Sequence, residues 1–281
     1  MDFKSVDLSK YALVLEGGGM RGVFTAGVLD YFLDAKIEFP YAIGVSAGAG
    51  NVLNFMSKQR GRTKTMDIDY LEKYNYIGIS TLIRTGNIMN FGLLFDKFPN
   101  VIYPYDFQTY LNNPTKCEVV ATDIETGEAV YMDDRTTLDR LNIVCQASCS
   151  LPFVCKITEL DGKKFLDGGI ADAIPFQRAF DQGYDKCVVI LTRPLGYRKN
   201  PNGMKCPNFV YKKYPKLQER LRRKNMEYNI LMDKIEAMEK TGEIIVVRPV
   251  DVKGVDRLEK SPKKLTALYN HGYEVAKEMF G

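Results

Sequence analysis

The feature that most constrains this chain is a glycine-rich turn around one serine, Gly44-Val45-Ser46-Ala47-Gly48. It has the Gly-x-Ser-x-Gly pattern of a nucleophile elbow, a strained strand-to-helix turn that lifts the serine Oγ clear of the backbone. Glycines suit it, because close packing of strand on helix leaves little room for side chains two residues either side of the serine. A buried strand is predicted at 41–45 and a helix at 47–58. An ordinary Gly/Ala-rich turn is the alternative interpretation.

A glycine cluster precedes the elbow and follows a continuous apolar run, Tyr11–Leu15, which is typical of a buried parallel strand. After the cluster, 23–35 has a helical apolar pattern. The cluster consists of Gly17, Gly18, Gly19, Met20, Arg21 and Gly22.

Gly-x-Gly-x-x-Gly after a strand matches a dinucleotide-binding fingerprint, which also requires an acidic residue at the end of the next strand. The nearest candidate is Glu38, but Pro40 follows it closely and the next strand leads to Ser46 instead. The other use of such a loop is an oxyanion hole, because consecutive glycines let successive N–H groups converge on one oxygen. Arg21 would then hold the loop or attract an anionic head group.

Beyond the second helix, residues 59–115 lack the strand–helix pattern and are rich in aromatic side chains. We expect this insertion to line an apolar cleft or form a lid, or simply to pack over one sheet edge. A hairpin turn is predicted at Asp161-Gly162. Further strands are predicted at 117–122, 129–132, 156–158, 163–166 and 186–191, and helices at 138–148 and 175–182.

Composition indicates a globular protein, with 45% hydrophobic and 26% charged residues and a net charge of +4. The start, Met1-Asp2-Phe3-Lys4, does not resemble a signal peptide, and no apolar run approaches the length of a membrane span. The six cysteines include no Cys-x-x-Cys pair, which favours reduced core thiols in a cytosolic protein. With one histidine in the chain, we expect no metal site. We also expect no cofactor.

The character of the sequence changes near Pro194, and a basic run follows between Lys205 and Lys224. The run contains eight basic residues and one acidic residue, so the remainder of the chain is net negative. A solvated helix face and a contact with a phosphate-rich partner or anionic membrane both remain open. A helix is predicted at 217–240, a strand at 244–247 and a last amphipathic helix at 262–280.

A serine nucleophile requires a base, and a Ser-His-Asp triad would have to use His271. That residue lies about 90° from the centre of the apolar stripe of the last predicted helix, so we expect it near the surface. A carboxylate base is the alternative. Asp167 follows a short strand and precedes two glycines, and it can act if it is held within hydrogen-bond reach of the serine.

Four motifs in order resemble those of the patatin-like phospholipase family: the Gly17–Gly22 cluster, the Gly44–Gly48 elbow, Ala147–Pro152 and Asp167-Gly168-Gly169. The resemblance covers about residues 10–195. It implies a three-layer α/β/α fold with a mostly parallel sheet and a Ser–Asp dyad without a catalytic histidine. Ser46 would be the nucleophile, Asp167 the base, and Gly17, Gly18, Gly19, Met20, Arg21 and Gly22 the oxyanion-hole loop. Gly44, Gly48, Gly168 and Gly169 would support the motifs.

One departure from the family pattern lies just after the base. Where many members have an asparagine shortly after Asp-Gly-Gly, this chain has Asp172-Ala173. The part from about residue 201 resembles an extension found in a bacterial subgroup. We therefore expect an acyl hydrolase domain at 8–200 and a mainly helical extension at 201–281, with one strand, packed on it.

The expected function is a cytoplasmic lipid acyl hydrolase of the phospholipase A or lysophospholipase type, with no nucleic-acid partner. Peripheral contact with the inner face of the membrane is compatible with the basic run. Two rivals stay open: a nucleotide-binding α/β protein, which predicts tight nucleotide binding and no serine reactivity, and a non-catalytic membrane-surface or scaffold module, which predicts liposome binding without turnover.

Overall fold

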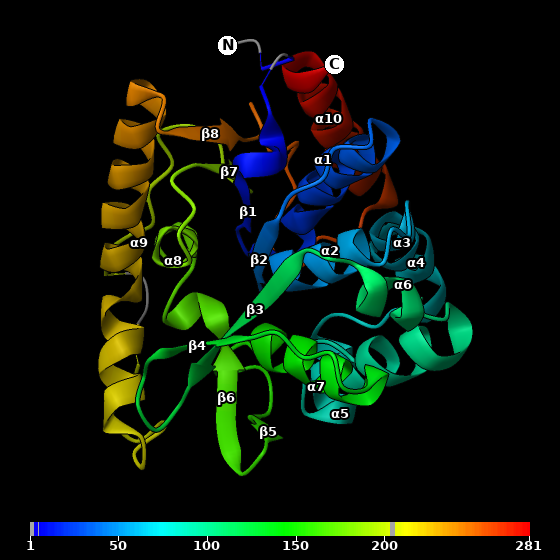
Figure 1. Cartoon of the computed structure of the whole chain (residues 1–281). Helices are drawn as coiled ribbons and strands as arrows, with labels where there is room; N and C mark the ends of the chain where they lie inside the picture. Colours follow the sequence, from blue (N-terminus) through cyan, green and yellow to red (C-terminus); the bar gives the residue numbers. More distant parts are fainter. Residues whose placement is uncertain (1–2, 5, 203–205) are drawn as a thin grey trace.

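The structure is a computed structural model that describes residues 3–4, 6–202 and 206–281 (Figure 1). Over these residues the strands form one eight-stranded sheet in the order β5-β6-β3-β2-β1-β7-β8, with β4 paired to β3. Met1, Asp2 and Lys205, which entered the expectations above, lie outside the described residues.

Continuous apolar runs form the centre of the sheet, as expected for strands buried on both faces. β8, β7, β1, β2 and β3 run parallel, whereas β4 and β6 pair antiparallel with β3, and β5 pairs antiparallel with β6. The sheet is therefore mostly parallel, as predicted. The strands are β1 (Ala12–Leu15), β2 (Tyr41–Val45), β3 (Lys116–Asp123), β4 (Ala129–Met132), β5 (Thr158–Leu160), β6 (Lys163–Asp167), β7 (Cys187–Ile190) and β8 (Ile244–Val247).

Helices cover both faces of the sheet and complete the three-layer α/β/α architecture (Figure 1). One face carries α1 (Gly22–Asp34), α2 (Ala47–Met56), α7 (Leu138–Cys149) and α10 (Pro262–Phe280), and the other carries α8 (Phe176–Asp181) and α9 (Pro215–Thr241). Alternate strand residues divide between two cores: Leu13 packs with the first set of helices and Val14 with the second. The alternation follows from the two-residue period of a strand.

The 59–115 insertion folds into short helices and turns. Its buried aromatic side chains, Phe98 and Tyr110 among them, join the core on the α1 side of the sheet. The segments are α3 (Arg62–Lys64), η3 (Thr65–Asp69), α4 (Tyr70–Tyr74), α5 (Ile79–Thr85), η4 (Leu93–Ile102) and α6 (Phe107–Asn112). Other single turns in the chain are η1 (Leu8–Lys10), η2 (Gly19–Arg21) and η5 (Gly168–Ile170).

The C-terminal part continues the same sheet and covers both of its faces. β8 pairs with β7 in register from Cys187↔Ile244 to Ile190↔Val247. α10 crosses α1 at backbone contact, because a Cβ on Gly27 would overlap the carbonyl of Tyr269. The Tyr269 hydroxyl also donates to the Asp30 carboxylate of α1 at 2.6 Å. None of the helices within the described residues has the length and apolar character needed to cross a bilayer.

Candidate active site

Ser46 lies in the turn between β2 and α2 with a left-handed backbone, φ 55° and ψ −122°. A positive φ is strained for a residue with a side chain and is held only by its surroundings. Here the surroundings are two close contacts. A Cβ on Gly44 would overlap the carbonyl of Gly48, and one on Gly48 would lie 2.6 Å from the carbonyl oxygen of Leu15 in β1. The turn therefore has the strained geometry of an elbow, and its two glycines are required by packing.

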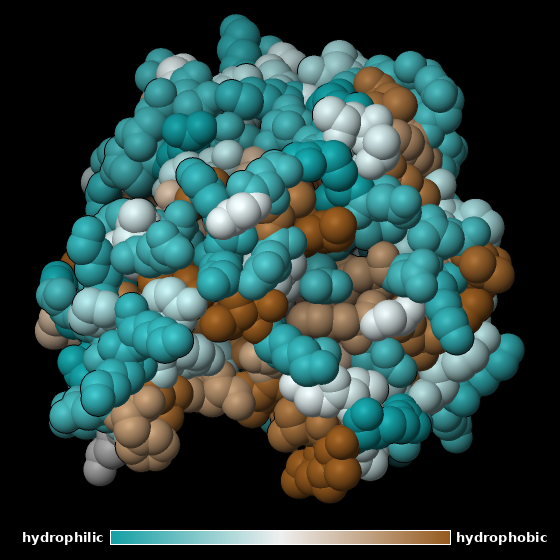
Figure 2. Space-filling view, turned by 90° about the horizontal axis from the view of Figure 1, so that it is seen from below, coloured by the Kyte–Doolittle hydropathy of each residue, from teal (hydrophilic) through white to brown (hydrophobic). Residues whose placement is uncertain are grey.

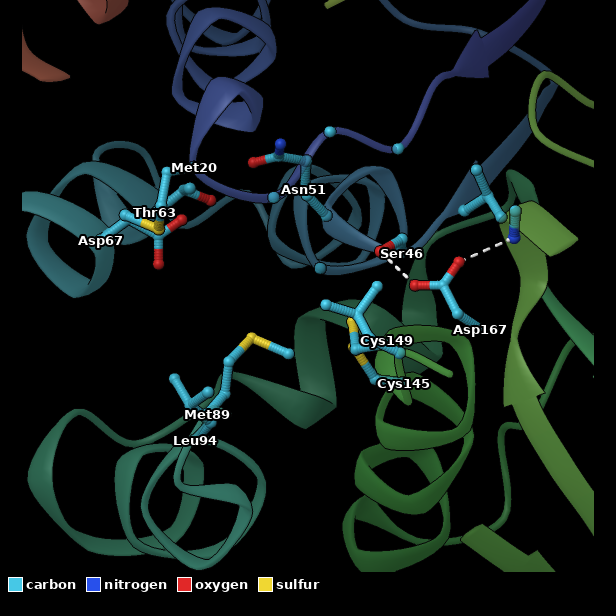
Figure 3. Close-up of a pocket in the computed structure, with 18 of the residues that line it drawn as sticks. Met20, Ser46, Asn51, Thr63, Asp67, Met89, Leu94, Cys145, Cys149 and Asp167 are labelled. Atoms are coloured by element: carbon cyan, nitrogen blue, oxygen red, sulfur yellow. Dashed lines mark hydrogen bonds between the residues drawn. The ribbon is translucent and has the colours of Figure 1, made fainter. Parts of the chain in front are cut away.

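Asp167 ends β6 and brings its carboxylate to the elbow (Figure 3). The Ser46 hydroxyl donates to Asp167 Oδ2 at 2.7 Å. The two residues are 121 positions apart and meet because β2 and β6 both pair with β3. The Asp167 side chain is buried, with 5% of its surface exposed, and Ser46 is half-buried and open to the adjoining cavity.

Three contacts hold Asp167 in position. Its Oδ1 accepts from the Gly169 N–H at 2.8 Å, its own N–H donates to the Ser150 carbonyl at 2.8 Å, and its carbonyl accepts from the Thr122 hydroxyl at 2.9 Å. Gly168 packs against the β3 backbone at Val120. The departure from the family pattern at Asp172 does not weaken this support.

Asp172 instead accepts a hydrogen bond from the Tyr131 hydroxyl at 2.9 Å. Burial raises the pKa of Asp172, although that hydrogen bond opposes the shift. The residue therefore belongs to a separate buried contact between β4 and the segment after β6.

The glycine cluster runs along the cavity beside the elbow, where a Cβ on Gly17 would lie 3.0 Å from Ser46 Cβ. Its N–H groups differ in availability. The Met20 N–H donates to the Arg257 carbonyl at 3.1 Å, and the Gly22 N–H donates within the η2 turn. Among the described residues, no acceptor is found for the N–H of Gly17, Gly18 or Gly19. The N–H groups of these three glycines are therefore available to an anion in the cavity.

The cavity extends from the Ser46–Asp167 pair between α2, α7 and the 59–115 insertion (Figure 3). Apolar side chains form much of this part of the wall, while Asn51, Thr63 and Asp67 add polar groups. Burial raises the pKa of Asp67 to about 6. The apolar members include Leu53, Met66, Ile77, Met89, Leu94, Phe95 and Leu141. The insertion thus lines a largely apolar cleft.

His271 is not part of this cavity and lies on α10, where its Nε2 accepts from the Val250 N–H at 3.1 Å. It is partly exposed, and burial is the main cause of its lowered pKa. Glu38, the acidic residue on which the nucleotide interpretation depended, forms an exposed ion pair with Lys58 at 2.9 Å. The position of His271 therefore does not support a Ser-His-Asp triad, and that of Glu38 does not support a nucleotide-binding site.

Two features of the site were not predicted from the sequence. Ser148, fully buried on α7, accepts a hydrogen bond from the Ser46 N–H at 2.8 Å and so links the elbow to α7. Its position inside the Ala147–Pro152 motif was the one available signal. The second feature is a group of basic side chains in the cavity wall that comes mainly from residues after 190.

All six cysteines are free thiols, and Cys145 and Cys149 lie in the cavity wall next to the pair. A hydrogen bond with Cys145, and then burial, raise the pKa of the Cys149 thiol. This thiol is therefore protonated at neutral pH and a poor nucleophile. Among the described residues, no group of three His, Cys, Asp or Glu side chains is placed to hold a metal ion.

Comparisons with known proteins agree with the motifs. A family model described as "Patatin-like phospholipase" matches residues 13–180, and one described as "Domain of unknown function (DUF6363)" matches residues 214–280. The chain is 33% identical over 210 residues to "Uncharacterized protein YjjU" of Escherichia coli (strain K12). That match covers 70% of this chain and 56% of the relative, so the chain spans little more than half of the relative's length.

Among solved structures, the chain is similar to VipD from Legionella pneumophila, with a TM-score of 0.49 and 15% identity, over 96% of this chain and 66% of that one. The family assignment does not depend on this likeness. It depends on the family model, which matches more than half of the chain. The chain belongs to the patatin-like phospholipase family.

Proposed function

We propose that the protein hydrolyses acyl esters of lipids with Ser46 as nucleophile and Asp167 as general base. The observation that carries the proposal is the 2.7 Å hydrogen bond from Ser46 Oγ to Asp167 Oδ2, in an elbow that opens to a largely apolar cavity. A carboxylate at this distance can accept the hydroxyl proton as Oγ attacks the ester carbonyl.

The negative charge that develops on the carbonyl oxygen needs donors already in place. The free N–H groups of Gly17, Gly18 and Gly19 are the proposed donors, and the start of α2 adds the positive end of a helix dipole. We leave the amides of Met20 and Gly22 out of this role, because both are already hydrogen-bonded.

The proton balance closes over two half-reactions. Asp167 takes the serine proton and passes it to the leaving alcohol oxygen as the ester C–O bond breaks, which leaves an acyl-serine. A water then gives its proton to Asp167 while its oxygen attacks the acyl carbon, and the proton returns to Ser46 Oγ as the fatty acid departs.

The test is covalent labelling with a fluorophosphonate, followed by intact-mass measurement and mapping of the adduct. We expect one adduct, on Ser46, and a loss of at least ~10³ in kcat for a p-nitrophenyl ester in Ser46→Ala. Ser80→Ala, an exposed serine on α5, is the matched control and should label and react as wild type. Normal turnover by a folded Ser46→Ala protein would refute the proposal.

We further propose that the protein is cytoplasmic and touches an anionic membrane near the start of α9, which lies at the lower end of Figure 1. The favouring observation is the exposed loop before this helix. Phe209 is 81% exposed there, and Lys212 and Lys213 are also exposed. Figure 2 shows hydrophobic residues protruding on the face seen from that end. In contrast, Arg220 and Arg223 of the basic run are paired with acidic side chains of α9.

Reversing Lys212, Lys213 and Arg222 to glutamate should weaken co-sedimentation with anionic liposomes at low salt. Each basic side chain near such a surface adds about 1 kcal/mol, screened over about 8 Å at physiological salt. Hydrolysis of a soluble short-chain ester reports whether the variant is folded. Equal co-sedimentation of wild type and variant at low salt would refute the membrane contact, and the basic run would then be a solvated helix face.

A further inference from the structure

A group of basic side chains lines the cavity that contains Ser46 and Asp167. They come from separate parts of the chain: the glycine cluster, the segment after β7, α9 and the segment after β8. We name them the cationic cluster: Arg21, Arg193, Lys199, Lys224 and Arg257. Four of the five lie beyond residue 180, outside the part of the chain that the patatin-like model matches.

No ion pair within 4.0 Å neutralises any member of the cationic cluster among the described residues. The structure has many such pairs elsewhere, for example Arg178 with Glu118 at 2.8 Å and Arg198 with Glu236 at 2.9 Å. Within the cluster, Arg21 is 5% exposed and its buried Nε lacks a hydrogen-bond partner. Burying a charged donor without an acceptor costs free energy, so an anion bound at this part of the cavity wall would be stabilised.

The acidic groups that face the cluster are already occupied by hydrogen bonds. Glu16 accepts from the Thr192 N–H at 2.6 Å and from the Tyr228 hydroxyl at 2.8 Å. Asp167 accepts from Ser46 and Gly169. These two carboxylates provide two negative charges against at most five positive ones, since Lys199 has a pKa of about 7 and is partly neutral at that pH.

Burial and mutual repulsion both act on the cluster. Burial, and after it repulsion from Arg193 and Arg257, lowers the pKa of Arg21 to about 10. Burial is also the main cause that lowers the pKa of Lys199 to about 7 and that of Lys224 to about 8. Lys199 is held in the wall with its Nζ 3.4 Å from the ring centroid of Tyr228. Each side chain of the cluster thus lies close enough to at least one other member for electrostatic repulsion between them.

Lys224 connects the cluster to the dyad. The negative charge of Asp167 raises the pKa of Lys224, and the positive charge of Arg257 lowers it. Arg257 also packs against the glycine cluster, since a Cβ on Gly19 would lie 2.6 Å from Arg257 Cγ. An anionic group held by these side chains would therefore sit beside the Ser46–Asp167 pair.

We propose that the cationic cluster is a subsite for a phosphate monoester on the substrate. The preferred substrates are then acyl esters that carry an unsubstituted phosphate, such as lysophosphatidic acid, rather than esters with a zwitterionic phosphocholine. The inference deepens the proposed function and rests on it. A dianionic phosphate compensates most of the excess positive charge, whereas a choline ammonium would add a sixth cation next to it.

The first experiment measures binding without turnover. Isothermal titration with inorganic phosphate and with glycerol 3-phosphate, at constant ionic strength, should give saturable binding that chloride does not reproduce. Arg257→Gln and Lys199→Gln should each weaken it about tenfold, the value of one charge-assisted hydrogen bond. Arg257→Lys should restore part of the loss, and Lys240→Gln, an exposed lysine at the end of α9, is the matched control.

The second experiment compares turnover of lysophosphatidic acid and lysophosphatidylcholine with the same acyl chain. Wild-type kcat/KM should favour the phosphate monoester by about tenfold or more, and Arg257→Gln should reduce that ratio by about tenfold. A wild-type ratio at or below one, or a ratio unchanged in a folded Arg257→Gln and Lys199→Gln, would overturn the proposal.

The two proposals fail in different ways. Fluorophosphonate labelling of Ser46 together with a flat head-group ratio would overturn the subsite and leave the hydrolase. Phosphate binding that responds to the variants, without turnover of any ester, would overturn the hydrolase. Phosphate binding without preference for lysophosphatidic acid would assign the cluster to free phosphate and overturn the head-group subsite.

Discussion

Replacement of Asp167 by asparagine separates a Ser–Asp dyad from any mechanism with another base. In the structure, Oδ1 accepts from the Gly169 N–H and Oδ2 accepts from Ser46 Oγ. Asparagine has the same shape, so its amide oxygen can keep the Gly169 contact, and the backbone bonds to Ser150 and Thr122 remain. Its amide nitrogen, however, would donate to the serine and cannot take its proton.

The expected loss follows from that exchange. A positioned general base contributes about 10²–10⁴ to a rate. Since no other acidic or histidine side chain hydrogen-bonds Ser46 in the described residues, we expect Asp167→Asn to lose at least about 10³ in kcat, roughly 4 kcal/mol of transition-state stabilisation. The melting temperature should change by about 4 °C at most, because the contacts that hold the residue survive.

The assay is steady-state hydrolysis of a soluble p-nitrophenyl ester, with circular dichroism melting of the same samples. His271→Ala is the matched control and should retain most activity, because His271 does not line the cavity and accepts a hydrogen bond from the exposed Val250 amide. A folded Asp167→Asn protein with more than about a tenth of wild-type kcat would refute the dyad. So would an inactive but folded His271→Ala protein.

Three further changes probe the elbow and the cavity. Ser148→Ala removes the acceptor of the Ser46 N–H and should cost about 1–3 kcal/mol in urea denaturation, with a lower kcat; unchanged values for both would show that the contact is dispensable. As a separate variant, Gly44→Ala should cost about 1–3 kcal/mol by overpacking. Gly50→Ala, whose added Cβ meets nothing within 4 Å, should be neutral or stabilising in the same measurement. Glycerol 3-phosphate should bind more weakly as pH rises from about 7 past about 8, because an anion favours the charged forms of Lys199 and Lys224, and these forms are lost above their pKa values of about 7 and about 8. Titration calorimetry from pH 7 to 9, where the phosphate monoester is mostly dianionic, checks this, and Lys199→Arg should remove the part of the loss near pH 7.

Much of the fold was predictable because its signals are local. Continuous apolar runs marked the central strands, and the predicted last helix, 262–280, matches α10 (Pro262–Phe280). The strand at 244–247 was also predicted, but its partner was not. Pairing with β7 depends on shape and burial across more than fifty residues of chain, which no local pattern records. The proposed domain boundary near residue 200 stays a prediction.

The candidate site divides in the same way. Ser46 and Asp167 each stand in a short motif with a backbone reason for its glycines, so both could be named from the sequence as a hypothesis. Ser148 also lies in a motif, Ala147–Pro152, but nothing in the local sequence indicates that its hydroxyl accepts a hydrogen bond from the Ser46 N–H. The cationic cluster was invisible because Arg21 and Arg257 are 236 positions apart and meet only in the folded chain.

The crossing of α1 with α10 has a consequence for when the protein can become active during its synthesis. α1 is buried along nearly its whole length, and the glycine cluster just before it is held by the carbonyl of Arg257. Both supports leave the ribosome long after Ser46 does, roughly 10 to 50 s later at usual elongation rates of about 5–20 residues per second. Until then Ser46, the proposed nucleophile, stands in a nascent chain whose α1 is uncovered and whose glycine cluster lacks its contact with Arg257. The ester hydrolysis proposed for Ser46 should therefore appear only after α10 has docked on α1.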